Sequence, residues 1–108
     1  GKFILATPQA VQAAAAAALT AIPKDLCFSL TDPPGNDSYP IGGTVWAVFY
    51  RQLDPNRARD LTKFLDWAMD AEHGQKHALA LGYAPLPAQL VAAVRNELAS
   101  VVPRGATP

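Results

Sequence analysis

Three side chains near the middle of the chain have the chemistry of metal ligands: Glu72, His73 and His77. The two histidines are spaced so that they lie one turn apart on a helix. Gly74 lies between them, no third ligand is evident, and the sequence contains no HExxH pattern. We therefore interpret the pair as solvated side chains at a helix end and predict no metal site.

A second candidate is the run Gly42-Gly43-Thr44, because a glycine-rich backbone can approach an anion closely. The run lacks the spacing of a Walker phosphate-binding loop, and no obvious helix follows it to supply an N-terminus. Glycines are common where a chain enters a strand. We favour that interpretation over an anion site.

No set of residues suggests catalysis. Cys27 is the only cysteine, so it cannot form an intrachain disulfide, and its strand-like neighbours predict a place in the core. Ser29 and Ser38 form no recognisable nucleophile arrangement with the histidines, and no GxSxG motif is present. The sequence therefore predicts that the protein is not an enzyme and that it has no catalytic residue and no cofactor.

Composition bounds the remaining function classes. The 108 residues suffice for one small domain, and half of them are apolar, which excludes a disordered tail. Nine basic and nine acidic residues give no net charge, so nucleic acid is not an expected partner. Accordingly, Trp46, Trp67, Phe64 and Tyr83 are predicted to be core and rim aromatics, because base stacking normally accompanies a positive groove.

The element that must organise the fold is a predicted strand at residues 44–51, where β-branched and aromatic side chains follow one another almost without interruption. Such a run is typical of a strand covered by helices on both faces. Residues 38–43 precede it and contain one proline and two glycines, so we interpret them as a crossing segment. Residues 26–30 are a shorter strand candidate, and residues 2–6 form either an edge strand or an extended lead-in.

The rest of the chain is predicted to be helical. Thr7-Pro8 and Asp54-Pro55 each pair an N-cap residue with a proline at the first helical position, and they predict helices over 8–21 and 55–71. A shorter helix over 75–81 is closed by Gly82, and Pro87 starts the last one. The apolar faces expected on the second and last helices are Leu61, Phe64, Leu65, Ala68 and Met69, and Leu90, Val91, Val94, Leu98 and Val101.

Several motifs together resemble the C-terminal portion of periplasmic phosphate-binding proteins of ABC uptake systems. They are Tyr39-Pro40-Ile41, Phe64-Leu65-Asp66-Trp67, Gly74-Gln75 and the most specific of them, LGYAPLP at residues 81–87. The resemblance implies an α/β, partial type II periplasmic-binding-protein-like fold, with about four helices on a small sheet of two or three strands. It divides the chain into the end of a second lobe (1–37), a crossing segment with the main strand (38–51) and a helical part of the first lobe (52–108).

The resemblance also implies where the phosphate site is. In the family, the ligands come from the start of the first lobe and from a loop early in the second, and neither segment occurs in this sequence. The phosphate-binding residues therefore stay unknown, and the chain is expected to be unable to bind phosphate alone. The residues expected to act as hinge between the lobes are Tyr39, Pro40, Ile41, Gly42 and Gly43.

The expected partners are inorganic phosphate, once the other segments are present, and the membrane subunits of an ABC importer. The expected location is the periplasm or, as a lipoprotein, the cell surface. No secretory signal and no transmembrane span occur in the sequence, and its start at Gly1 is compatible with a signal further upstream. The alternative is a self-associating structural or interaction module derived from the same fold.

Overall fold

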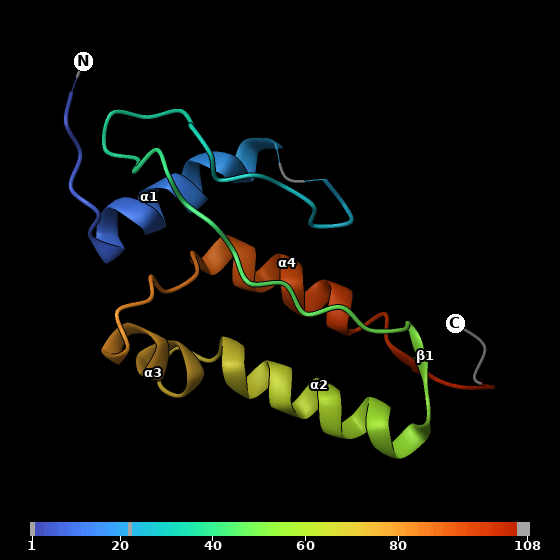
Figure 1. Cartoon of the computed structure of the whole chain (residues 1–108). Helices are drawn as coiled ribbons and strands as arrows, with labels where there is room; N and C mark the ends of the chain where they lie inside the picture. The colour runs from blue at the N-terminus through green and yellow to red at the C-terminus, as the bar shows by residue number, and fades with distance from the viewer. Residues whose placement is uncertain (1, 22, 106–108) are drawn as a thin grey trace.

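In the part of the chain that the structure describes, the fold consists of four α-helices and a small parallel sheet, as predicted (Figure 1). The computed structural model describes residues 2–21 and 23–105. In chain order the elements are α1 (Pro8–Ala18), the 3₁₀ helix η1 (Leu19–Ala21), β1 (Gln52–Leu53), α2 (Pro55–Met69), α3 (Gly74–Ala80), α4 (Ala88–Leu98) and β2 (Val102–Pro103).

Two of the helices begin where their capping residues predict. The Thr7 hydroxyl accepts a hydrogen bond from the N–H of Ala10 at 3.2 Å, and the Asp54 carboxylate accepts one from the N–H of Asn56 at 3.0 Å. Each satisfies a backbone donor that has no partner within its own helix, and a proline follows each cap. Local sequence is therefore sufficient to place the starts of α1 and α2.

Helices α2 and α4 run antiparallel, side by side, and α3 makes the turn between them (Figure 1). Their buried side chains are Ala58 from α2 and Leu90 and Leu98 from α4. At the far end, β1 and β2 pair in parallel, and the Val102 N–H donates to the Arg51 carbonyl at 3.0 Å. The end of the chain is thus tied to the residues that lead into α2.

The end of α3 follows the glycine signal. Gly82 has a φ of +84°, which L-residues with a side chain rarely adopt. Its N–H donates to the Leu79 carbonyl at 3.0 Å, while the Tyr83 N–H donates to the Ala78 carbonyl at 2.9 Å. This pair of bonds is a Schellman motif, so the predicted left-handed cap at Gly82 is confirmed.

The strand predicted at 26–30 is wrong, and of the two alternatives for 2–6 the structure has the extended lead-in. Phe3 is fully exposed in an extended lead-in, and Leu26 has a φ of +59° within a turn closed by its N–H and the Pro23 carbonyl. A strand cannot continue through such a turn, and Cys27 is therefore exposed rather than in the core. Here strand-like composition alone was misleading.

The strand predicted at residues 44–51 is wrong over its whole length, because β1 begins only at Gln52. Residues 44–50, named the extended segment from here on, have no strand partner among the described residues, and only Gln52–Leu53 enters the sheet. Val45 and Val48 are each 93% exposed and Tyr50 is 82% exposed, whereas Phe49 is 36% exposed and Trp46 packs on Phe28, so the segment is only partly covered. The side-chain types favour a strand, but no neighbouring strand or helix layer among these residues completes it.

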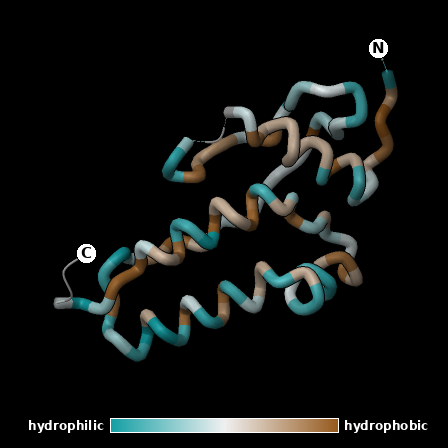
Figure 2. Tube along the Cα trace, turned by 180° about the vertical axis from the view of Figure 1, so that it is seen from behind, coloured by the Kyte–Doolittle hydropathy of each residue, from teal (hydrophilic) through white to brown (hydrophobic). Residues whose placement is uncertain are grey.

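The described part of the chain has a small core. Its Cα radius of gyration is 15.6 Å, whereas a compact domain of this length has one of about 13 Å. No large side chain in residues 2–21 and 23–105 is fully buried. Figure 2 shows apolar stretches along the tube, including the lead-in to α1, alternating with polar ones rather than gathering in one centre.

Candidate functional site

The crossing segment (residues 38–43) is held against the N-terminal part of the molecule. The buried hydroxyl of Ser38 donates to the Pro34 carbonyl at 2.9 Å, and the Tyr39 N–H donates to the Ala10 carbonyl of α1 at 3.0 Å. Thr31 and Ile41 form an antiparallel bridge. The crossing segment is therefore anchored by its backbone and by Ser38, although the Ile41 side chain within it is 76% exposed.

The two glycines of the crossing segment differ in whether neighbouring atoms leave room for a side chain. A Cβ on Gly42 would lie 3.1 Å from the Cβ of Leu30, which is buried, whereas a Cβ on Gly43 would meet no atom within 4 Å. Gly42 is thus explained by close packing against Leu30. Nothing in the geometry of these glycines indicates an anion site, and a hinge role for the crossing segment stays a prediction.

The motif residues Gly74 and Gln75 join α2, α3 and the segment that follows α3. A Cβ on Gly74 would collide with the backbone of Ala68 near the end of α2. The Gln75 amide nitrogen donates to the Ala68 carbonyl at 2.8 Å, and its amide oxygen accepts from the Leu86 N–H at 2.8 Å. These motif residues therefore have a structural role that spacing alone did not reveal, since both partners lie outside α3.

His73 and His77 do not converge on a common point. The Nδ1 atom of His73 lies 2.6 Å from an Asp70 carboxylate oxygen, whereas the His77 ring lies 6.1 Å, centroid to centroid, from the ring of Trp67. The hydrogen bond from His73, together with one from the Glu72 N–H, lowers the pKa of Asp70. In residues 2–21 and 23–105, no group of three potential ligands could hold a metal ion.

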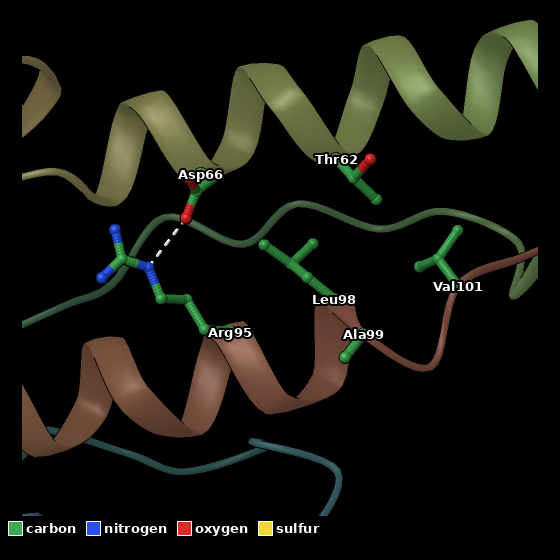
Figure 3. Close-up of a pocket in the computed structure, with 6 residues that line it drawn as sticks. All are labelled: Thr62, Asp66, Arg95, Leu98, Ala99 and Val101. Atoms are coloured by element: carbon green, nitrogen blue, oxygen red, sulfur yellow. Dashed lines mark hydrogen bonds and ion pairs between the residues drawn. The ribbon is translucent and has the colours of Figure 1, made fainter.

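A hollow of about 430 Å³ lies between α2 and the C-terminal end of α4 (Figure 3). Its lining residues are Thr62, Asp66, Arg95, Leu98, Ala99 and Val101. The Arg95 Nε atom donates to an Asp66 carboxylate oxygen at 2.8 Å. Since the guanidinium already faces a carboxylate, which would repel an anion, this hollow has no uncompensated positive charge with which to recruit phosphate.

A second hollow, of about 490 Å³, separates the residues after α1 from α4. Its lining residues are Leu19, Pro23, Lys24, Leu26, Gln89, Ala93, Asn96 and Glu97. Lys24 and Glu97 bring opposite charges to it, and the remaining residues are neutral. The Glu97 carboxylate in this lining would repel a small oxyanion.

The aromatic side chains lie mostly on the surface. Trp46 meets Phe28 edge to face at 5.3 Å between ring centroids, and Trp67 stacks with Phe64 at 6.2 Å. Phe64 and Tyr83 are 60% and 62% exposed, so the prediction that Phe64 belongs to the apolar core stripe of its helix is wrong. Trp67 is 45% exposed.

Comparison with known proteins gives matches to phosphate-binding proteins named PstS. The match to the protein from Haemophilus influenzae is 28% identical over 90% of this chain, that from Methanocaldococcus jannaschii 29% over 81%, and that from Xylella fastidiosa 31% over 93%. The chain spans only 29%, 25% and 27% of these relatives, respectively.

No protein-family model and no solved structure matches the chain. The three relatives nevertheless bear out the resemblance that was predicted from the motifs at residues 39–41, 64–67, 74–75 and 81–87. Over most of its length the chain is therefore similar to about a quarter of a PstS phosphate-binding protein, consistent with its C-terminal portion.

Proposed function

We propose that this chain is the C-terminal scaffold of a phosphate-binding protein that serves an ABC phosphate importer. The similarity to three PstS proteins over 81–93% of the chain is the observation that carries the proposal. In this role the chain contributes binding architecture and no catalytic step. The phosphate ligands belong to polypeptide outside these residues.

The linings of the two hollows support the proposal that the phosphate ligands lie outside these residues. Phosphate sites combine backbone N–H groups, hydroxyls and a bidentate arginine in a closed space. In the hollow between α2 and α4, Arg95 is already paired with Asp66, and the second hollow has mixed charge. Both linings contain a carboxylate, Asp66 in the first and Glu97 in the second, which would repel an oxyanion.

We propose that the crossing segment acts as the hinge. Tyr39, Pro40, Ile41, Gly42 and Gly43 link the part that contains α1 to the part that contains α2, α3 and α4. The bonds of this segment go to Leu30, Asp32 and Ala10, all on the N-terminal side. Bending is then expected to concentrate at Gly43, where a side chain would meet no neighbour.

The partners in this proposal are inorganic phosphate and the membrane subunits of the importer, and the location is the periplasm or, if a lipid anchor is attached elsewhere, the cell surface. No helix described in residues 2–21 and 23–105 has the length and apolar character needed to span a membrane.

Isothermal titration of the purified 108-residue chain with inorganic phosphate tests the proposal. We expect no saturable binding by the chain alone, because each of the two described hollows is lined by a carboxylate that would repel phosphate. Arsenate and sulfate, titrated in parallel, show whether any heat is specific for phosphate. Tight, specific phosphate binding by the isolated chain would contradict the proposal.

A second candidate function is self-association as an interaction module, which the exposed apolar side chains of the extended segment favour. It predicts a dimer or larger assembly whose amount rises with protein concentration. Light scattering over a hundredfold concentration series, on the order of 1 to 100 μM, measures this directly. A monomer throughout the series would exclude this candidate.

A further inference from the structure

We draw no further inference here: the strongest candidate, the exposed aromatic patch that Phe64 and Trp67 of α2 form beside His77 of α3, is an unpartnered apolar face, and nothing in the described residues 2–21 and 23–105 shows what covers it.

Discussion

The region from α2 to α4 and the extended segment are both rich in apolar residues, but they differ in how their backbones are satisfied. In the helices, each turn bonds to the next, and Asp54 and Gly82 complete the starts and ends within a few residues. The backbone of the extended segment cannot be satisfied by nearby residues in this way, because a strand's hydrogen-bond partners lie on another strand. The same chain therefore contains one region that its own sequence completes and one that it leaves incomplete.

This difference explains why the molecule has little core. The helices pack on one another through small or scattered contacts at Ala58, Leu90 and Leu98, while the largest β-branched and aromatic side chains lie outside. Exposing these side chains forgoes about 1.5–3 kcal/mol of hydrophobic stabilisation for each one. A low stability of the isolated chain is the expected consequence.

The largest expected effect on stability is the loss of a buried apolar side chain, compared with the loss of an exposed one. Leu90 is 3% exposed, so Leu90→Ala should destabilise the fold by about 3 kcal/mol through lost burial and a new cavity. Val48→Ala should change stability by less than about 0.5 kcal/mol, since Val48 is 93% exposed. Urea unfolding followed by circular dichroism measures both. Similar losses would mean that the extended segment is packed in solution, and the comparison would fail.

The next largest effect on stability is expected at Gly74, where α3 begins close to the end of α2. Gly74→Ala would bring a methyl group into the Ala68 backbone and should cost about 2–3 kcal/mol. Gly43→Ala is the control, because the space around that position is free, and it should leave stability unchanged or raise it by about 0.5 kcal/mol. Thermal unfolding of both variants is the measurement. Equal midpoints would show that the corner is looser than the structure indicates.

Gln75→Ala should lower the free energy of unfolding by about 1–2 kcal/mol, somewhat less than Gly74→Ala. The substitution leaves the Leu86 N–H and the Ala68 carbonyl without their side-chain partner. Gln89→Ala is the control, because Gln89 is an exposed residue of α4. Its substitution should change the free energy of unfolding by no more than about 0.5 kcal/mol. Hydrogen exchange at the Leu86 amide reports directly on the lost bond. Slow exchange there in the Gln75 variant would contradict the assigned role.

The smallest effect is on acid stability. Because the pKa of Asp70 is lowered in the folded state by His73 and the Glu72 N–H, its stabilising contribution is complete above the ordinary value of 3.8 and is lost as the pH falls through the lowered pKa. Asp70→Asn should remove this small part of the decline in stability below about pH 4. Unfolding midpoints measured between pH 5 and 2, on the order of ten points, test this. An unchanged acid profile would show that the pair contributes nothing.

The candidate site could be predicted only in part. The absence of a nucleophile arrangement and the resemblance to phosphate-binding proteins were readable from the sequence. The sequence did not predict the packing of Gly42 on Leu30 or the two hydrogen bonds of the Gln75 side chain. In each case the contact depends on residues that a helix or a turn brings into place. The exposure of Cys27 was missed for the same reason, since it follows from a left-handed turn at Leu26.

By itself, the sequence determined the starts of α1 and α2, the glycine end of α3 and the amphipathic character of the helices that follow. These features rest on bonds between residues close together in the chain, which local residue types specify. Only the tertiary structure decided that residues 44–50 stay unpaired and exposed and that the sheet is reduced to β1 and β2. The physical reason is that a strand's backbone and both its faces are satisfied by distant residues, so its side chains can favour a sheet without providing one.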